Sequence, residues 1–286
     1  MTNNFHIPEM VIRAIEYADR EYSKSGDVSA TQLLKPNYQK WLELKYSDQI
    51  EIDASAKINA LIGKAMHLLF EKSNPGNFTE FELTHQFDSG IVVSGRVDFY
   101  DHKTKTLIDY KTTKVSTIKN QRIIQNWTNQ LNIYAWLMHK NKIPVDNIAV
   151  IAFLKNWEKY IMKTQEDYPR TAIIEIPIPL LPFENTENFV MSRVREHQNI
   201  YVSEPSFCNA VERWENEPKY AVRKLGSEKN YRVKETIEEA EIELNKLKHP
   251  ENYKIETLEP EPFRCLDSDY CAVNKFCPYY KELRND

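Results

Sequence analysis

The chain has 286 residues, 41% of them hydrophobic, and a formal net charge of −4, which suits one large domain or one domain with an appendage. A slightly acidic chain gives no overall support for nucleic-acid binding, so that role would need local clusters of basic residues. The polar N-terminus and the lack of an apolar run of about 20 residues predict a cytoplasmic protein without a secretory signal or membrane span.

In the first quarter of the chain, apolar residues at helical spacing predict helices over residues 8–22, 30–44 and 53–72. Ser29 is the expected N-cap of the second helix, and residues 24–27 form a loop before it. The third helix carries His67, with Gly63 one turn earlier. From the residue type alone, a satisfied, partly buried histidine is the favoured interpretation of His67. Gly63 favours a functional one, because a glycine inside a helix costs about 1 kcal/mol and often marks close approach of a backbone or ligand.

The middle of the chain predicts an α/β fold. Two hairpins come first, followed by a helix, two further strands and a helix, which together form a mixed central sheet flanked by helices. The expected strands cover residues 78–87, 91–100, 107–114, 148–154 and 172–178, and the expected helices cover residues 119–140 and 187–201.

After residue 203 the character of the sequence changes. Residues 207–234 are rich in charge and poor in regular periodicity, Thr236 caps a short helix, and a proline-rich stretch over residues 250–262 leads to a tail with three cysteines. We therefore expect two domains, a core over residues 1–202 with N-terminal helices and a C-terminal cysteine-containing appendage over residues 203–286.

The second hairpin, over residues 95–114, carries the chemistry. Asp109 and Lys111 are two residues apart on one strand, so their side chains point to the same face. If the polar faces of the two strands meet, Asp98 joins them. By itself an Asp-x-Lys pattern on a strand more often means solvated surface charges. Carboxylates beside an ammonium nevertheless suit a hard cation such as Mg²⁺ or Mn²⁺ and a phosphate group, and a histidine ligand would favour Mn²⁺ somewhat.

Four motifs in order resemble the RecB-like branch of the PD-(D/E)XK nuclease superfamily. They are the histidine His67, then Gly-Arg-Val-Asp98, Asp109-Tyr-Lys111 and Gln130-Leu-Asn-Ile-Tyr134, spread over about residues 55–140. Each motif is degenerate by itself, but four in this order are specific. The resemblance implies a restriction-endonuclease-like core and a metal-dependent DNA nuclease.

Carried over to this chain, the resemblance makes Lys111 the catalytic lysine, acting with the carboxylates Asp98 and Asp109. The expected ligands of Mg²⁺ or Mn²⁺ are His67, Asp98, Asp109 and the main chain of Tyr110.

The helix after the hairpin completes the expected site. By the resemblance, Gln130 and Tyr134 contact DNA or order the site, although without the other motifs an ordinary helix-surface pair would be favoured. Trp127, one turn earlier, could stack on a base but is more often a core residue. Cations near the active strand are the expected phosphate contacts, namely Lys114, Lys119 and Arg122. A basic run over residues 219–234 is a weaker candidate, because glutamates dilute it.

The cysteines Cys208, Cys265, Cys271 and Cys277 all lie in the last third of the chain. In a reducing compartment clustered cysteines more often mean metal than disulfide. RecB-like nucleases often hold a [4Fe–4S] cluster with one distant cysteine and three C-terminal ones. This chain departs from that pattern, because its lone cysteine follows the nuclease motifs and its C-terminal cysteines lack a Cys-x-x-Cys. A [4Fe–4S] cluster that staples the tail to the core is the favoured interpretation, with Zn²⁺ or no metal as the alternatives.

Together these features predict an exonuclease of phage type that acts on DNA in recombination or repair, in a bacterial or phage-infected cytoplasm. A single-strand annealing protein is a candidate partner, and an oligomer is compatible with the sequence. The alternatives are a structure-specific or nicking endonuclease, and a DNA-binding scaffold without catalysis.

Overall fold

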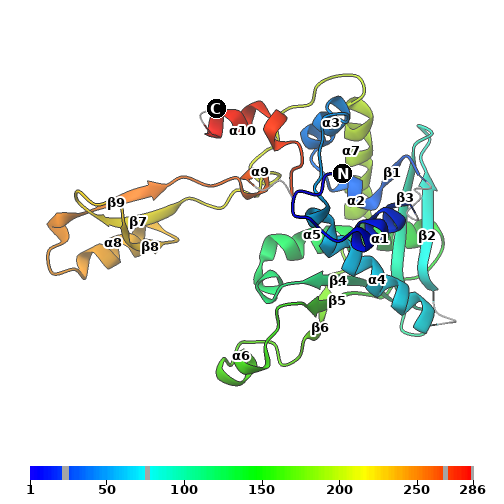
Figure 1. Cartoon of the computed structure of the whole chain (residues 1–286), viewed down its shortest axis with the longest axis horizontal. Coiled ribbons are helices and arrows are strands. Elements are labelled where there is room, and N and C mark those ends of the chain that lie inside the picture. The colour runs from blue at the N-terminus through cyan, green and yellow to red at the C-terminus, as the bar shows by residue number, and fades with distance from the viewer. Residues whose placement is uncertain (21–25, 75–77, 267–269, 285–286) are drawn as a thin grey trace. The chain divides into compact units, whose positions relative to one another are not determined.

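The structure is a computed structural model that describes residues 1–20, 26–74, 78–266 and 270–284. The chain divides into two compact units, Met1–Pro205 and Ser206–Asp286, which are called unit 1 and unit 2 below (Figure 1). Residues 21, 22, 24 and 25, which belong to the predicted first helix and to the loop after it, lie outside the described residues.

Unit 1 holds a six-stranded mixed sheet with helices packed around it (Figure 1). Its strands are β1 (Val28–Ser29), β2 (Phe78–Gln86), β3 (Val92–Asp101), β4 (Thr106–Thr113), β5 (Asn147–Leu154) and β6 (Ile173–Ile178). Its helices are α1 (Glu9–Arg20), α2 (Ala30–Leu33), α3 (Asn37–Lys45), η1 (Ala54–Lys57), α4 (Ile58–Ser73), η2 (Val115–Lys119), α5 (Gln121–Lys140), α6 (Lys159–Thr164) and α7 (Phe183–Asn199). The predicted mixed sheet flanked by helices is confirmed.

The strands follow the order β1-β3-β4-β5-β6, and β2 also pairs with β3. The β2–β3, β3–β4 and β5–β6 pairs are antiparallel, whereas β4 and β5 are parallel, with Thr113 opposite Leu154 at their ends. A parallel pair needs a long crossover, which α5 provides. Helix α5 is therefore held across the sheet, and its inward side packs into the core through Leu131, Ile133 and Leu137, each fully buried.

Two local predictions for unit 1 need correction. The predicted helix over residues 30–44 is broken into α2 and α3, because Pro36 cannot continue the first of them. Ser29 does cap α2, with a complete capping box to Gln32. Helix α7 begins at Phe183, four residues before the predicted start, after Pro182 at its N-cap position. Helix α4 has no buried residue despite its helical apolar spacing, and Leu69 is 60% exposed.

Unit 2 contains a three-stranded antiparallel sheet in the order β8-β7-β9, formed by β7 (Lys219–Lys224), β8 (Asn230–Lys234) and β9 (Tyr253–Leu258). Its helical elements are α8 (Ile237–Asn245), η3 (Pro250–Asn252), α9 (Phe263–Leu266), η4 (Asn274–Phe276) and α10 (Pro278–Arg284). The prediction of little regular structure over residues 207–234 is wrong, because two strands form there around Gly226, whose φ of 75° suits the turn. Thr236 accepts a hydrogen bond from the Glu239 amide and caps α8 as predicted.

Across the residues that the structure describes, we find no helix that combines the length and the apolar character needed to span a membrane.

Candidate active site

Strand β4 contributes side chains to both faces of the unit 1 sheet. The ring of Tyr110 packs on Phe70 of α4, with ring centroids 4.6 Å apart. Its neighbours Asp109 and Lys111 instead contact Gln130 of α5. Because successive residues of a strand point to opposite faces, α4 and α5 lie on opposite sides of β4. This places His67 of α4 and Gln130 of α5 around one strand.

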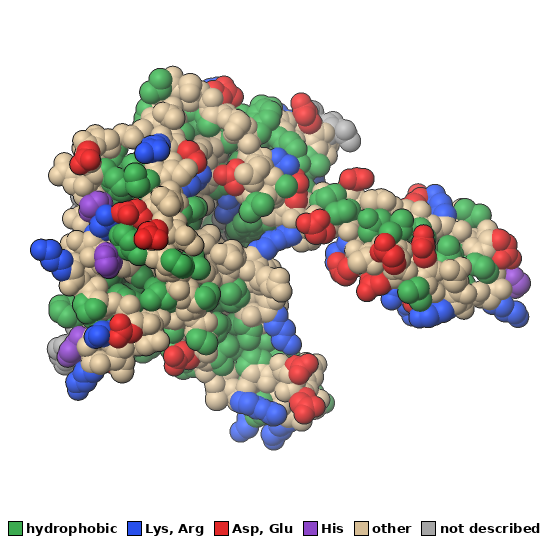
Figure 2. Space-filling view, turned by 180° about the vertical axis from the view of Figure 1, so that it is seen from behind, with side chains coloured by type: hydrophobic (Ala, Val, Ile, Leu, Met, Phe, Trp, Pro, Cys, Tyr) green, Lys and Arg blue, Asp and Glu red, His purple; other side chains and the backbone are tan. Residues whose placement is uncertain are grey.

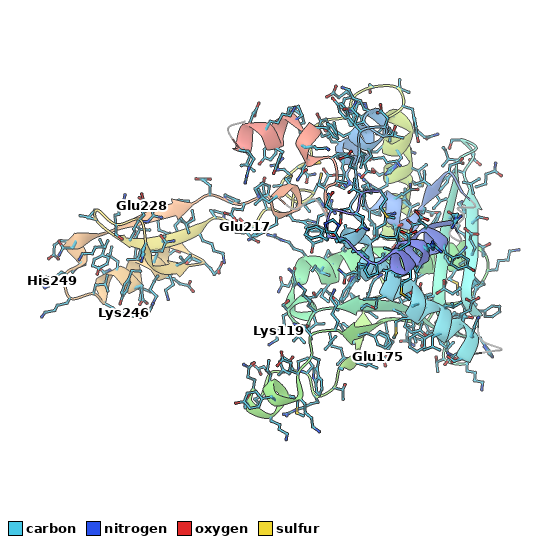
Figure 3. All side chains as sticks on the ribbon, in the orientation of Figure 1. Lys119, Glu175, Glu217, Glu228, Lys246 and His249 are labelled. Carbon is cyan, nitrogen blue, oxygen red and sulfur yellow. The ribbon has the colours of Figure 1, made fainter. Side chains whose placement is uncertain are left out.

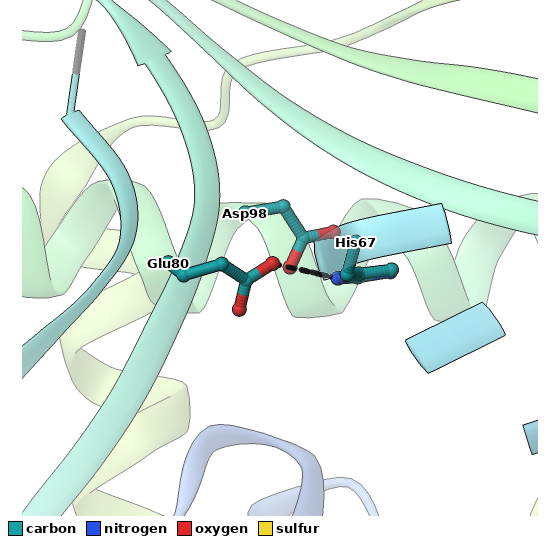
Figure 4. A group of neighbouring side chains, drawn as sticks. All are labelled: His67, Glu80 and Asp98. Atoms are coloured by element: carbon teal, nitrogen blue, oxygen red, sulfur yellow. Dashed lines mark hydrogen bonds and ion pairs between the residues drawn. The ribbon is translucent and has the colours of Figure 1, made fainter. Parts of the chain in front are cut away.

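His67, Glu80 and Asp98 form a compact group of potential metal ligands (Figure 4). The Nδ1 atom of His67 lies 2.8 Å from Glu80 Oε1 and 3.6 Å from Asp98 Oδ1. One ligand atom from each residue lies within 4.8 Å of the others. An imidazole and two carboxylates are a donor set that binds divalent cations, Mn²⁺ in particular. The residues therefore fit a divalent metal ion.

Glu80 is a site residue that the sequence alone did not single out. In the β2–β3 register Thr79 pairs with Phe99 and Phe81 with Val97, so Glu80 lies opposite Asp98. Its φ of 47° is in the left-handed region, which is strained for a glutamate. Two carboxylates directly across a pair of strands repel each other. The only local signal was a charged residue in a strand, which is too common to indicate a site.

Asp109 and Lys111 form a second group beside the first. Lys111 Nζ lies 2.7 Å from Asp109 Oδ2 and donates a hydrogen bond of 3.1 Å to Gln130 Oε1. Gln130 in turn donates through Nε2 to Asp109 Oδ1 at 3.2 Å and to the hydroxyl of Tyr134 at 3.1 Å. The amide of Gln130 thus orients both the carboxylate and the ammonium of the Asp-x-Lys motif, and all of these groups except Lys111 are buried.

Burial and charge act together on Asp98. Desolvation, and then the negative charge of Asp109, raise the pKa of Asp98 to about 7, although His67 and Lys111 act in the opposite direction. Burial alone would lower the pKa of His67, but its hydrogen bond to Glu80 and the charge of Asp98 raise it. The raised pKa of Asp98 means that burial and the nearby negative charge disfavour its charged form. A cation bound between the carboxylates would offset both effects.

The main chain of Tyr110 also lies at the site, where its N–H donates a 2.8 Å hydrogen bond to Asp98 Oδ2. Trp127 is 6% exposed and belongs to the core. Lys114 is exposed on the connection between β4 and α5, and Arg122 is half-buried in the first turn of α5. A Cβ at Gly63 would meet no described atom within 4 Å, so the expected close approach of another backbone at that glycine is wrong within the described chain.

The four cysteines lie in unit 2 as free thiols. Burial raises the pKa of Cys208 to about 12, and the neighbouring charges of Glu212 and of the other cysteines add to the effect. The pKa of Cys265 is also raised to about 12, first by burial and then by Cys271 and Cys277. The sulfur atoms of Cys265, Cys271 and Cys277 are therefore within electrostatic range of Cys208, although these residues follow it in the sequence by 57 positions or more. Arg213 donates a hydrogen bond to the carbonyl of Cys208 and supports this segment.

A family model described as the PD-(D/E)XK nuclease superfamily matches residues 13–278. The structure of SSO0001 is similar at 19% identity and a TM-score of 0.45, and the match covers 72% of this chain and 88% of that one. A phage related exonuclease from Haemophilus somnus 129PT is similar at 15% identity and a TM-score of 0.39, over 64% of this chain and 96% of its own. No curated protein matches the chain significantly.

Proposed function

The chain belongs to the PD-(D/E)XK nuclease superfamily, and we propose that it is a metal-dependent deoxyribonuclease of the RecB-like branch, an exonuclease acting in DNA recombination or repair. The observation that carries this proposal is the convergence of His67, Glu80 and Asp98 beside the Asp109–Lys111 pair. An exonuclease that degrades one strand of DNA leaves the other strand single-stranded. A single-strand annealing protein, which would bind that strand, is the candidate partner.

His67, Asp98 and Asp109, with the main chain of Tyr110, are the proposed metal ligands, and Glu80 is added to them from its geometry. When bound, Mg²⁺ or Mn²⁺ would polarise the phosphate and lower the pKa of a bound water. Lys111 stabilises negative charge that develops on the phosphate. The side-chain amide of Gln130 orients Lys111 and Asp109 through hydrogen bonds. The hydroxyl of Tyr134 accepts a further hydrogen bond from Gln130 and so fixes the orientation of that amide.

Two other functions remain alternatives, a structure-specific or nicking endonuclease and a DNA-binding scaffold. The scaffold is disfavoured because a purely structural strand gains little from burying Asp109 at 2% exposure beside Asp98 at 9%. An exonuclease is favoured over a site-specific endonuclease because the sequence shows no recognisable sequence-reading module.

The test is cleavage by the purified protein with Mn²⁺ or Mg²⁺. Linear DNA is expected to be degraded, and Asp109→Ala or Lys111→Ala is expected to lower the rate by at least about 100-fold, since each removes a group that acts on the phosphate. Lys103→Ala, in the exposed turn at the opposite end of β4, is the matched control and should retain activity. Cleavage of closed circular DNA would favour the endonuclease, and wild-type protein inert on linear, nicked and single-stranded DNA would favour the scaffold.

For unit 2 we propose that Cys208, Cys265, Cys271 and Cys277 bind a [4Fe–4S] cluster, with Zn²⁺ as the alternative. The proposal is supported by four cysteines that form no disulfide, are buried or half-buried, and include three within electrostatic range of Cys208. Its role is structural, as a staple within the appendage. Anaerobic purification is expected to yield brown protein absorbing at roughly 400 nm. Colourless protein with stoichiometric zinc would select the alternative.

A further inference from the structure

Two chain segments leave the same edge of the unit 1 sheet next to the candidate active site. Strands β4 and β5 are parallel, so both end there, at Thr113 and Leu154. The Lys155 amide donates to the Thr113 carbonyl at 2.8 Å, and the Val115 amide donates to Asn156 Oδ1 at 2.8 Å. The start of η2 and the connection leading to α6 therefore run side by side. Lys111 lies two residues before the end of β4, about 7 Å along the strand.

The α6 connection is a fixed projection and not a loose loop. The indole of Trp157 donates to the Pro169 carbonyl at 2.8 Å, which ties the two ends of the connection together. The hydroxyl of Tyr168 accepts from the Glu158 amide at 3.0 Å and donates to the Asn156 carbonyl at 3.3 Å. Side chains on α6 are thereby presented in a defined orientation relative to the ends of β4 and β5.

One surface of this projection carries unneutralised positive charge. Lys159 and Lys163 are both exposed and lie one helical turn apart, an arrangement that is unfavourable for two like charges. Within the described ranges neither of them has a carboxylate at ion-pair distance. Tyr160 lies beside them and is 76% exposed. In Figure 2, Lys and Arg side chains gather on one side of the projection and acidic side chains on the other.

The neighbouring segment adds cations of the same kind. Lys114 precedes η2 and Lys119 ends it, both exposed, and residues 114–122 include no acidic residue. Lys119 is labelled in Figure 3, on the side of unit 1 from which α6 projects.

The basic run of unit 2 differs, because three of its six cations pair with carboxylates, Arg223 with Glu256 among them. Lys219 pairs with Glu235, and Lys234 with Glu243. A solvated face therefore accounts for the unit 2 run, whereas the α6 surface keeps its charge available to an anionic partner.

We propose that Lys159, Tyr160 and Lys163 of α6, together with Lys114 and Lys119, bind a single-stranded segment of DNA next to the active site. This inference rests on the proposed nuclease function and deepens it. The lysines contact successive phosphates, and the exposed ring of Tyr160 stacks on a base. A base can stack in this way only where the strand is unpaired, so the surface selects single-stranded DNA over duplex.

The test measures binding of a fluorescent single-stranded oligonucleotide by anisotropy, with full-length protein in EDTA to prevent cleavage, over a range of salt concentrations. For Lys159→Ala/Lys163→Ala, the slope of log K against log salt is expected to fall by about 1.4, since each lost contact to a single strand removes about 0.7. For Tyr160→Ala, affinity for the single strand should fall roughly tenfold with the salt slope unchanged, while duplex affinity stays the same. Lys72→Ala/Lys103→Ala, two exposed lysines on other elements, is the matched control.

The outcomes separate this inference from the proposed function. If wild-type protein cleaves DNA with Mn²⁺ but the α6 lysine variant keeps the wild-type affinity and salt slope, the α6 surface is not the binding site and the nuclease assignment stands. An equal loss of duplex and single-strand affinity in Tyr160→Ala would overturn the single-strand preference. If wild-type protein neither binds nor cleaves DNA, both proposals fail.

Discussion

Glu80 shows how one residue combines backbone strain with chemistry. Its left-handed φ of 47° costs free energy, and its carboxylate lies opposite that of Asp98. His67 Nδ1 faces both carboxylates, 2.8 Å from Glu80 Oε1 and 3.6 Å from Asp98 Oδ1, so a cation held between them would reach all three side chains. These three features are unfavourable or neutral for folding, but together they suit a metal site.

We therefore predict that Glu80→Gln weakens Mn²⁺ binding by about tenfold or more, because it removes a negative charge next to His67 and loosens the ring's orientation. Isothermal titration calorimetry measures the effect without relying on activity. Glu82→Gln, an exposed acid on the same strand, is the control and should bind Mn²⁺ as wild type does. Equal affinities for the two variants would remove Glu80 from the metal site.

His197 of α7 predicts a pH dependence of stability. Burial, and then the charges of Arg193 and Lys40, lower the pKa of His197 to about 4 from 6.5. The unfolded chain therefore binds the proton more readily than the folded one. Stability is complete above pH 6.5 and decreases as pH falls toward 4, by about 2 kcal/mol between pH 7 and pH 5.

Urea unfolding at the two pH values measures this loss. His197→Gln cannot be protonated, so its free energy of unfolding should depend less on pH by the same amount. Parallel pH profiles for the two proteins would show that another group causes the acid sensitivity.

At the scale of elements, a glycine sets how closely α5 approaches the sheet. A Cβ at Gly95 of β3 would lie 2.7 Å from Leu137 Cδ1 and 3.0 Å from the ring of Tyr134. Both atoms belong to α5, and Tyr134 holds the Gln130 amide. The small residue before Asp98 is therefore a packing requirement of the site.

Gly95→Ala is expected to destabilise unit 1 by about 1–3 kcal/mol, because the core is overpacked, and to disturb the Gln130–Tyr134 pair. Gly63→Ala on α4 is the matched glycine change. No described atom lies within 4 Å of its added Cβ, so it should stabilise the helix by up to about 1 kcal/mol. Thermal denaturation measures both, and a stabilised Gly95→Ala would contradict the packing explanation.

At the scale of the whole molecule, the chain holds two compact units with different chemistry. The candidate active site lies within unit 1, and the four thiols lie within unit 2. If the proposed cluster is structural, loss of its metal should act on the stability of unit 2 and leave the divalent site intact.

Cys271→Ser is therefore expected to lower the iron or zinc content to near zero and to destabilise unit 2, since a thiolate ligand and its metal bonds are lost. Metal analysis and calorimetry measure these effects, and titration with Mn²⁺ should give wild-type affinity at the unit 1 site. Asn245→Ser, exposed on α8, is the control. Unchanged metal content in Cys271→Ser would contradict ligation by this residue.

Local sequence patterns determined much of this protein. The Ser29 cap, the two hairpins around residues 88–90 and 101–106, and the order of the longer helices and strands in unit 1 follow from short-range spacing. The mixed sheet follows from that order, whereas the short elements β1 and α6 were not predicted. The superfamily was also predictable, because its motifs are contiguous pieces of sequence. The helix break at Pro36 could also have been predicted from the sequence, because proline lacks the backbone N–H that a helix needs, in any tertiary context.

Only the tertiary structure decided which side chains share the site. Glu80 is 18 residues from Asp98, and the β2–β3 register alone brings them opposite each other. In the same way, long-range folding brings Cys208 near cysteines that follow it by 57 residues or more, and strand pairing organises residues 219–234. The physical reason is that capping and turns depend on neighbours along the chain. Register, burial and the electrostatic field of a site depend on partners that only folding brings close.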